Sequence, residues 1–421
     1  MISFDTIEFA SQTDVGVRRS HNQDAHASHL ASDDAQWQER GHVFLVADGM
    51  GAHAVGELAS ELAVGIIPHT YQKHVSQVGV PALRKAFIEA NASIHAKGQQ
   101  NPDFVGMGTT TTALVLRPEG AWVGHVGDSR AYRVRDGQIE QMSFDHSLVW
   151  EMARRQGIEP ESLQGIPSNV IIRSLGPEPL VQVDIEGPHA LQSGDIFLLC
   201  SDGLSGQVSD AEMGAVASCL LPAEACRFLI DLANLRGGPD NITVMIVKVN
   251  EGSAVNPTQP PQRKFGRLIP WPFTALGIGL ISAAGAGLLT INDYRTLGIA
   301  LFPVAATFVI AGFLGLFLLS NQEKKKRAAI PVNGKPRFYR RSPCKVEPSL
   351  VQRIHKLLSG IESHLKEKQW DVNWEEYLLL VGRGDEASQK HDHAEAFRQY
   401  CRAMSLLAEA VQRHRALGEV L

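Results

Sequence analysis

The first 250 residues alternate short apolar runs with longer amphipathic segments. Runs rich in Val, Ile, Leu and Phe predict buried strands, here at 42–48, 111–116, 121–126, 195–200 and 241–249. Segments 57–75 and 81–99 have the spacing of amphipathic helices. The strands follow one another closely, and Asp136-Gly137 predicts a hairpin turn within 131–142. This pattern favours an antiparallel, layered α+β domain over a parallel βαβ fold.

Two apolar stretches without charged residues follow, at 273–291 and 297–319. About 20 apolar residues in a helix span a bilayer, so these stretches predict a two-helix transmembrane hairpin closed by the loop 292–296. Ala283, Gly285 and Gly287 would let its helices approach closely. The alternative is a pair of buried helices in a soluble domain.

Basic residues flank both apolar stretches. By the positive-inside rule, the flanks predict a two-pass protein of the cytoplasmic (inner) membrane, with its catalytic domain and its C-terminal tail in the cytoplasm. The flanking residues are Arg263, Lys264 and Arg267 before the stretches, and Lys324, Lys325, Lys326 and Arg327 after them. The basic juxtamembrane segment 320–346 also suits contact with anionic lipid headgroups.

The remaining regions are a linker and a tail. Segment 251–272 contains five prolines and is basic, which predicts a stiff linker without regular structure. Segment 347–421 predicts helices with no second catalytic constellation. One helical stripe in it carries Ala396, Tyr400, Ala403 and Leu407. Their spacing resembles the second helix of a tetratricopeptide repeat, but only one copy is found, so an ordinary helical bundle stays an alternative.

Composition narrows the class of protein. The chain of 421 residues is too long for one ordinary domain, and its formal net charge of −5 gives no strong attraction to nucleic acid. The five cysteines are odd in number and form no C-x-x-C pair, which argues against a disulfide framework or a zinc site. The N-terminus lacks the pattern of a cleavable signal peptide.

Three of the predicted strands end on an aspartate beside a glycine, at Asp48, Asp128 and Asp202. Asp24 and Asp240 are two further acidic points. Strand ends at one edge of a sandwich would bring these carboxylates together, where they repel one another unless cations lie between them. Short oxygen ligands favour Mg²⁺ or Mn²⁺. The alternative for any single Asp-Gly is a plain turn.

Glycine beside an aspartate lets the backbone approach a metal ion, so the Gly49 carbonyl is a candidate ligand. Two such ions about 4 Å apart would bind one water and lower its pKa, which makes a nucleophile suited to attack on phosphorus. Arg19, five residues before Asp24, is placed to bind phosphate in a bidentate manner. Its alternative is an ordinary surface arginine.

Eight ordered motifs between residues 5 and 250 resemble the metal-dependent serine/threonine protein phosphatases, protein phosphatase 2C, in their compact bacterial form. The motifs are TDVGVRRSHNQDA, VADGMGAHAVGE, GMGTTTTAL, HVGDSRAYRV, FDHSLVWEM, NVIIRSLG, LLCSDGLSGQVSD and GGPDNITVMIV. The resemblance implies that residues 1–250 form a catalytic β-sandwich flanked by helices, a four-layer α-β-β-α arrangement, with a binuclear metal centre at one end.

The resemblance also implies a role for each site residue. Asp48 would bridge the two metal ions, the Gly49 carbonyl would bind the second ion, and Asp202 and Asp240 would bind the first. Asp24 would hold metal-bound water, Asp128 with Asp202 would form a weaker third site, and Arg19 would bind the substrate phosphate. The mobile flap beside the site would run from about Asp145 to Arg173.

The chain departs from the family pattern in three places, at Met50, Gln23 and Ala52. Met50 stands where many eukaryotic members have a histidine, and His53 is a weaker candidate for that role than for a structural one. Gln23 replaces a glutamate of some relatives, and Ala52 replaces a glycine. None of these changes removes a direct metal ligand, so an active enzyme is expected.

The predicted function is removal of phosphate from phosphoserine and phosphothreonine in proteins by a hydroxide that bridges two Mn²⁺ or Mg²⁺ ions, in opposition to a serine/threonine kinase. The tail would bind a protein partner or control the enzyme. One alternative is a membrane-anchored phosphoprotein-binding sensor with weak catalysis, and a second is a hydrolase of small phosphate esters. The substrate protein, the pathway, the oligomeric state, the leaving-group acid and the acceptance of phosphotyrosine stay open.

Overall fold

The structure is a computed structural model that divides into two compact units, one of Met1–Thr258 with Pro336–Leu421 and one of Gln259–Lys335. It describes residues 6–51, 55–74, 80–163, 165–167, 169–250, 271–291, 299–301, 303–314 and 338–416.

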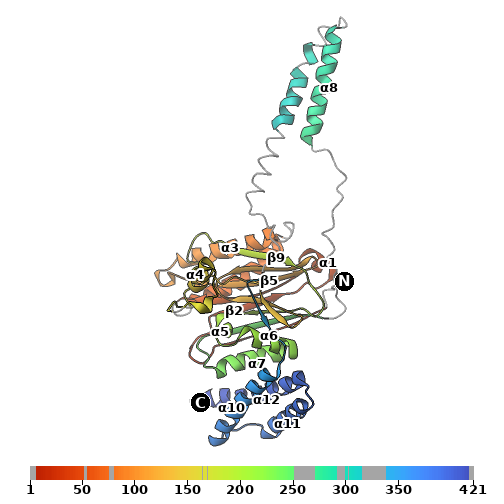
Figure 1. The fold of residues 1–421 in the computed structure, drawn as a ribbon. Coiled ribbons are helices and arrows are strands. Elements are labelled where there is room, and N and C mark those ends of the chain that lie inside the picture. The colour runs from red at the N-terminus through yellow and green to blue at the C-terminus, as the bar shows by residue number, and fades with distance from the viewer. Residues whose placement is uncertain are drawn as a thin grey trace. The chain divides into compact units, whose positions relative to one another are not determined.

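The first unit is built on two antiparallel sheets that lie face to face (Figure 1). One sheet has the order β1 (Ile7–Asp14), β11 (Ile242–Val249), β10 (Ile196–Cys200), β7 (Arg130–Arg135), β8 (Gln138–Gln141), β12 (Arg340–Pro343). The other has the order β2 (Asp24–His29), β3 (His42–Met50), β5 (Thr111–Arg117), β6 (Gly120–Val126), β9 (Asp184–His189), and β4 (Gly108–Thr109) pairs with β3. The first sheet is called the β11 sheet below and the second the β3 sheet.

Apolar residues on both faces of the central strands explain why each sheet is covered on both sides. Along β3, Val43 and Leu45 face the helices while Phe44 and Val46 face the other sheet, because successive side chains of a strand point to opposite faces. β11 repeats the pattern, with Val244 turned toward helices. Unlike a sheet with one solvated face, these strands therefore read as continuous apolar runs.

Helices α2 (Val55–Lys73) and α3 (Val80–Gly98) cover the β3 sheet, and α6 (Asp210–Cys219) and α7 (Pro222–Leu235) cover the β11 sheet. This arrangement agrees with the predicted α+β, four-layer α-β-β-α sandwich. The predicted hairpin turn is also present between β7 and β8, where Asp136 and Gly137 both have positive φ, 52° and 73°. Shorter helices are α1 (Asp34–Glu39), α4 (Leu148–Gln156), α5 (Asp202–Ser205), η2 (Pro102–Phe104) and η3 (Pro160–Ser162).

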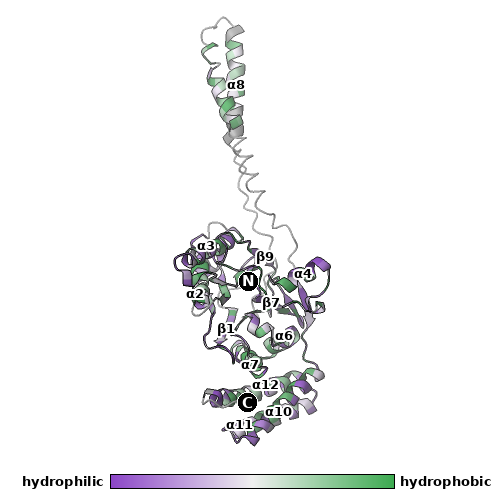
Figure 2. Ribbon diagram, turned by 90° about the vertical axis from the view of Figure 1, so that its left-hand side faces the viewer, coloured by the Kyte–Doolittle hydropathy of each residue, from purple (hydrophilic) through white to green (hydrophobic). Residues whose placement is uncertain are grey.

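The C-terminal part of the first unit contains α10 (Pro348–Glu367), α11 (Trp374–Gln389) and α12 (His393–Ala416). Hydrophobic and hydrophilic positions alternate around these helices, as expected of amphipathic helices (Figure 2). α12 packs on α7, and one apolar cluster runs without a break from the β11 sheet through α7 into the tail. Arg402 also pairs with Glu224 at 3.0 Å. The tail is thus a further layer of the same unit.

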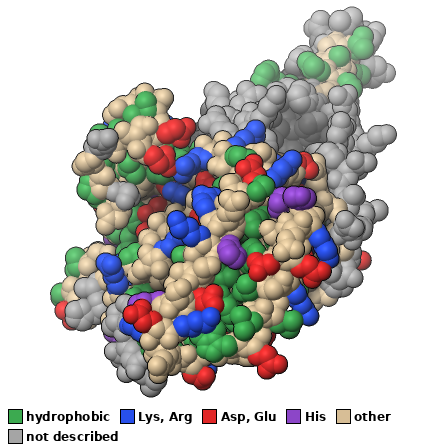
Figure 3. Space-filling model, turned by 60° about the horizontal axis from the view of Figure 1, so that its bottom comes forward, with side chains coloured by type: hydrophobic (Ala, Val, Ile, Leu, Met, Phe, Trp, Pro, Cys, Tyr) green, Lys and Arg blue, Asp and Glu red, His purple; other side chains and the backbone are tan. Residues whose placement is uncertain are grey.

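The outer face of the tail side mixes charges of both signs with short apolar patches (Figure 3). Leu378 and Leu379 of α11 are among the exposed large apolar residues, at 57% and 53%. α11 and α12 form one helical hairpin, and α10 packs against α12. A tetratricopeptide-like tail and an ordinary helical bundle both stay predictions.

The predicted transmembrane hairpin at 273–291 and 297–319 was wrong. Within the described ranges, no helix combines the length and the apolar character that a bilayer crossing requires. The described residues of this region form α8 (Trp271–Ile291) and a further helical stretch at 303–314. The prediction of a two-pass inner-membrane protein is corrected with it.

Two further predicted regions fall largely outside the described residues. They are the linker at 251–272, described only from 271, and the basic segment at 320–346, described only from 338. Ala52 and His53 also lie outside the described residues. All five cysteines are free thiols, as their spacing predicted.

Candidate active site

Asp24 and Asp48 face each other as a register pair between β2 and β3. Asp24 is buried, and one of its carboxylate oxygens accepts hydrogen bonds from the hydroxyls of Ser201 and Thr243, both at 2.7 Å. Ser201 follows β10 and Thr243 lies in β11, so these bonds join the ends of the two sheets. The strand-end aspartates are thereby brought to one edge of the sandwich.

Asp202 begins α5 and Asp240 lies on the turn before β11, and these two segments contact each other. The backbone at Gly203 lies so close to Asn241 that a Cβ there would meet the Asn241 carbonyl oxygen at 2.0 Å. The Asn241 side chain accepts from the backbone N–H of Gln23 and donates to the carbonyls of Val15 and His21, all at 2.9 Å. Asn241 therefore fixes the Asp240 turn against the loop that leads to Asp24.

Arg19 lies at the mouth of this acidic cluster. Its guanidinium donates to Asp240 at 2.8 Å while half of the side chain stays exposed to solvent. The hydrogen bond to Asp240, with the neighbouring charges of Asp48 and Asp202, raises the pKa of Arg19. A cation that remains exposed while touching the cluster is placed to meet an incoming anion.

Burial and the repulsion between neighbouring carboxylates raise the pKa values of four of these aspartates. Burial raises the pKa of Asp24 to about 7, against the opposing effect of its two hydroxyl donors. Burial and then the charge of Asp202 raise the pKa of Asp128 to about 8. The pKa of Asp48 lies well above its usual range, because of burial and then the charges of the other four aspartates. Burial and the charge of Asp240 also raise the pKa of Asp202.

The cluster has the features of a cation site. One carboxylate oxygen each of Asp24, Asp128 and Asp202 is buried without a hydrogen-bond partner. Such atoms are costly to bury unless a cation or water completes them. Among the residues that the structure describes, no three His, Cys, Asp or Glu side chains converge closely enough to hold an ion on their own. Carboxylate oxygens are donors that Mg²⁺ and Mn²⁺ prefer, and Mg²⁺ also keeps several water ligands.

Gly49 sits where no other residue fits. An added Cβ would lie 2.1 Å from the Gly56 carbonyl oxygen and 2.6 Å from that of Gln23. The N–H of Gly49 donates to the same Gln23 carbonyl at 3.1 Å. The backbone at Gly49 is thus held between the β2 loop and the start of α2, directly after Asp48.

Asp128 is held by a buried network on the opposite side of the cluster. Ser129 and Thr110 share a hydroxyl hydrogen bond of 2.7 Å, and Thr110 also accepts from the N–H of Asp48 at 3.1 Å. Arg130 pairs with Asp145 at 2.7 Å. Ser129 and Arg130 thus support the Asp128 loop.

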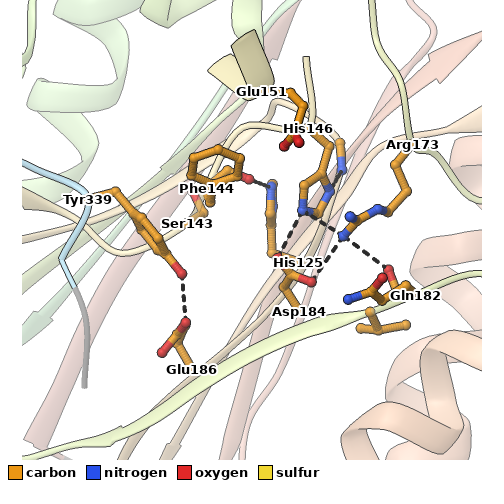
Figure 4. Close-up of polar contacts among 12 residues, drawn as sticks. His125, Ser143, Phe144, His146, Glu151, Arg173, Gln182, Asp184, Glu186 and Tyr339 are labelled. Atoms are coloured by element: carbon orange, nitrogen blue, oxygen red, sulfur yellow. Dashed lines mark hydrogen bonds and ion pairs between the residues drawn. The ribbon is translucent and has the colours of Figure 1, made fainter. Parts of the chain in front are cut away.

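The flap, defined here as residues 145–173, is anchored at both ends through His146 (Figure 4). The Nδ1 atom of His146 accepts from the N–H of Gly127 at 3.0 Å, and its Nε2 atom lies 3.0 Å from Asp184. Asp184 also pairs with Arg173 at 3.0 Å, where the flap ends. The neighbouring His125 is buried, which lowers its pKa to about 3, and its Nε2 atom contacts the Phe144 carbonyl.

A pocket of about 310 Å³ lies between the flap and the acidic cluster. Its walls include Asp128 and Asp202 from the cluster. The flap side contributes Trp150, Glu161 and Ile166. The flap therefore forms one wall of a space that opens next to the carboxylates.

The structure brings together the predicted aspartates Asp24, Asp48, Asp128, Asp202 and Asp240, with Gly49 and Arg19 beside them. Ser201, Thr243 and Thr110 were missed by sequence reasoning. Their only signal is a hydroxyl inside or next to an apolar strand, which ordinary strands also contain.

Comparison with known proteins indicates the family of the chain. The sequence profile described as Protein phosphatase 2C matches residues 16–229. The serine/threonine phosphatase stp of Listeria innocua is 35% identical over 245 residues, which are 57% of this chain and 94% of the relative. Protein phosphatase PhpP of Streptococcus pneumoniae is 35% identical over 254 residues, 59% of this chain and 100% of the relative. The crystal structure of the Mycobacterium tuberculosis serine/threonine phosphatase PstP is 32% identical, with a TM-score of 0.51, and the match covers 58% of this chain and 99% of that one.

Proposed function

This chain belongs to the protein phosphatase 2C family and is a serine/threonine phosphatase of that metal-dependent family, and on that premise we propose that the carboxylate cluster around Asp48 is its active site. The enzyme would remove phosphate from phosphoserine and phosphothreonine in proteins. The observation that carries the proposal is the convergence of five aspartates from distant parts of the chain, four of them with raised pKa.

We assign the metal-binding roles as follows. Asp48, at the centre of the cluster, would contact two cations. The Gly49 carbonyl would bind one of them, and Asp202 and Asp240 the other. Asp24 would hold coordinating water, since its second oxygen is already held by Ser201 and Thr243. Asp128 with Asp202 would bind a weaker third cation. The ions would be Mn²⁺ or Mg²⁺, and when bound they would supply an activated water for attack on phosphorus.

Arg19 would bind the phosphate group. Its contact with Asp240 keeps the guanidinium over the cluster, and its exposed half can turn toward a substrate. A planar guanidinium offers phosphate two parallel N–H donors, which a lysine cannot. Replacing Arg19 by Lys should therefore raise KM for the phosphopeptide and leave the free energy of unfolding nearly unchanged.

Water would attack the phosphate ester directly, without a phosphoenzyme. The leaving-group acid is not assigned, because Met50 after Gly49 cannot donate a proton. The kinases that make phosphoserine and phosphothreonine would be the enzyme's opponents. A protein partner of segment 347–421 stays a prediction.

Two other functions would leave different traces. A phosphoprotein-binding sensor would hold a phosphothreonine peptide without releasing phosphate. A hydrolase of small esters would prefer p-nitrophenyl phosphate to the peptide at equal concentration.

The deciding experiment measures phosphate release from a phosphothreonine peptide with Mn²⁺ present. The full chain should turn over repeatedly, and Asp48→Asn and Asp202→Asn should each lose activity by at least about 100-fold while they remain folded. Asp103→Asn, an exposed aspartate of η2, is the matched control and should keep full activity. Peptide binding without turnover by the unmodified chain would favour the sensor instead.

A further inference from the structure

The chain returns to the phosphatase unit at residue 338, beyond the part that matches the family profile. Residues 338–343, called here the return segment, add β12 to the free edge of β8, with Arg340 opposite Gln141 and Pro343 opposite Gln138. The backbone N–H of Tyr339 also donates to the Gln141 carbonyl at 2.9 Å. This segment therefore lies next to the base of the flap, which begins four residues after Gln141.

Arg340 reaches from the return segment onto the flap. Its guanidinium pairs with Glu161 of η3 at 2.8 Å and lies 5.7 Å from the centre of the Trp150 ring. On the same ring lies Arg130, at 5.6 Å. The Trp150 ring is thus approached by two guanidiniums, one from Arg130 at the start of β7 and one from the return segment.

Asp210 forms an ion pair with each of the two arginines. It lies 4.0 Å from Arg340 and 4.0 Å from Arg130, and it accepts from the Tyr132 hydroxyl at 3.0 Å. Asp210 begins α6, so this anchor belongs to the body of the domain and not to the flap. Arg340 therefore connects a fixed point of the domain to Glu161 on the flap.

Tyr339 contacts the base of the flap on its other side. Its hydroxyl donates to Glu186 of β9 at 2.6 Å, and its ring lies 5.4 Å from that of Phe144 (Figure 4). Phe144 in turn meets the Trp150 ring edge to face at 5.4 Å. Two consecutive residues of the return segment thus touch the residues that set the position of α4.

Those flap residues are the ones that face the acidic cluster. Trp150 and Glu161 line the pocket of about 310 Å³ that also contains Asp128 and Asp202. Apolar side chains of the flap wall, Val149, Leu163 and Ile166, line it as well. A pocket with this lining beside the phosphate position suits the residues that flank a phosphorylated serine or threonine.

We propose that Arg340 is a positioning residue of the phosphatase, which holds the flap, through Glu161 and Trp150, in the position that binds the peptide around the phosphorylated residue. The proposal rests on the placement of the active site at Asp48 and Asp202. It gives Arg340 a part in substrate recognition, although this residue lies outside the matched phosphatase region.

Arg341 supplies a matched control on the same strand. Because side chains alternate along a strand, Arg341 points away from the flap, pairs with Glu140 at 3.0 Å and lies 5.1 Å from the Phe338 ring. Its side chain is more exposed than that of Arg340, 62% against 25%. If β12 acted only as an edge strand, losing either arginine would have the same small effect.

The test compares kcat and KM of the full chain and of four variants, Arg340→Gln, Glu161→Gln, the double variant and Arg341→Gln. Each is assayed on a phosphothreonine peptide and on p-nitrophenyl phosphate, with Mn²⁺. Arg340→Gln and Glu161→Gln should each raise KM for the peptide about 3- to 10-fold, as expected for an ion pair with one exposed partner and a cation–π contact. The kcat on the small ester should stay within about twofold, because that substrate does not reach the flap wall.

Coupling between the two residues gives the second readout. The double variant should have the same peptide KM as Arg340→Gln, because Arg340→Gln already removes the ion pair with Glu161. Trypsin should also cleave faster after Arg154 and Arg155 on α4 in Arg340→Gln, because a released flap exposes its backbone. Arg341→Gln should match the unmodified chain in peptide KM, in kcat on p-nitrophenyl phosphate and in the rate of trypsin cleavage.

The proposal is overturned if Arg340→Gln and Glu161→Gln keep the peptide KM of the unmodified chain, or if Arg341→Gln raises it equally. Glu161 is exposed on a short flap turn, so its variant tests the contact even if Arg340→Gln folds poorly. The activity of Asp48→Asn distinguishes a failure of the Arg340 proposal from a failure of the active-site proposal. Full activity in Asp48→Asn would remove the active-site placement, whereas an inactive Asp48→Asn beside an unaffected Arg340→Gln would remove only the role of Arg340.

Discussion

The buried carboxylates of the acidic cluster destabilise the metal-free protein, and the same carboxylates would bind cations. Asp24 and Asp128 are buried with one oxygen each that no protein group completes. Their neighbours are also acidic, so the ionised forms repel one another. The same crowding that destabilises the metal-free cluster would favour a divalent cation among the carboxylates.

This cost predicts a dependence of stability on pH for the metal-free protein. Burial raises the pKa of Asp24 to about 7 and that of Asp128 to about 8, above the value of 3.8 for an unfolded aspartate. At a pH between the unfolded and the folded pKa, the folded state therefore binds more protons than the unfolded state. Stability therefore falls as pH rises. The window pH 7 to 8 suits the measurement, because an unfolded histidine, with a pKa of 6.5, is mostly neutral there, so His26, His125 and His189, whose pKa values are lowered by burial, contribute little.

The measurement is the unfolding temperature in EDTA across pH 7 to 8. It should fall with rising pH, fall less in Asp128→Asn, and become nearly flat with excess Mn²⁺. An unfolding temperature that rises across this window in EDTA would contradict the raised pKa values.

Gly49 gives a second prediction at the residue scale. In Gly49→Ala, the new Cβ would collide with backbone oxygens of Gly56 and Gln23, which cannot move without displacing α2 or the β2 loop. The free energy of unfolding should fall by about 1–3 kcal/mol, and activity should fall with it. Gly65→Ala in α2, where a Cβ meets no atom within 4 Å, is the control and should be neutral or stabilising in urea denaturation. Equal behaviour of the two variants would contradict the close approach at Gly49.

At the scale of elements, the sequence predicted the strands correctly. It did not predict the strand hydroxyls that bind the aspartates of the cluster. Apolar runs at 42–48 and 241–249 became β3 and β11, because a strand covered on both faces has few polar positions. Asp-Gly at the end of such a run is a visible exception and pointed to Asp48. Thr243 inside β11 has no such mark, since threonine is common in strands, and its bond to Asp24 depends on how the two sheets meet.

α12 provides the prediction at this scale. Leu407 is fully buried in the apolar cluster that α12 shares with α7 and the β11 sheet. Leu407→Ala should lower the free energy of unfolding by about 2–5 kcal/mol, and the tail and catalytic domain should still unfold in one transition. Leu379→Ala, at an exposed position of α11, is the control and should change little. Two separate calorimetric transitions, with only one moved by Leu407→Ala, would contradict the shared core.

For the whole molecule, the catalytic domain was predictable and the parts beyond residue 250 were less so. Eight motifs in order pointed to one fold, whereas the apolar stretches at 273–319 offered only composition as a guide, and the transmembrane interpretation was wrong. The stripe of Ala396, Tyr400, Ala403 and Leu407 indicated a buried helix face but not what covers it. The structure places that face against the other tail helices and α7, so the tail belongs to the core of the phosphatase unit.

The central claim is that aspartates from distant parts of the chain form one site for divalent cations. Isothermal titration of Mn²⁺ into the metal-free full chain tests it most directly, in two buffers of different ionisation enthalpy. The unmodified chain should bind Mn²⁺ and release protons, while Asp48→Asn and Asp202→Asn should each bind at least about 10-fold more weakly and Asp103→Asn should bind normally. Unchanged Mn²⁺ affinity in both Asp48→Asn and Asp202→Asn would contradict the account.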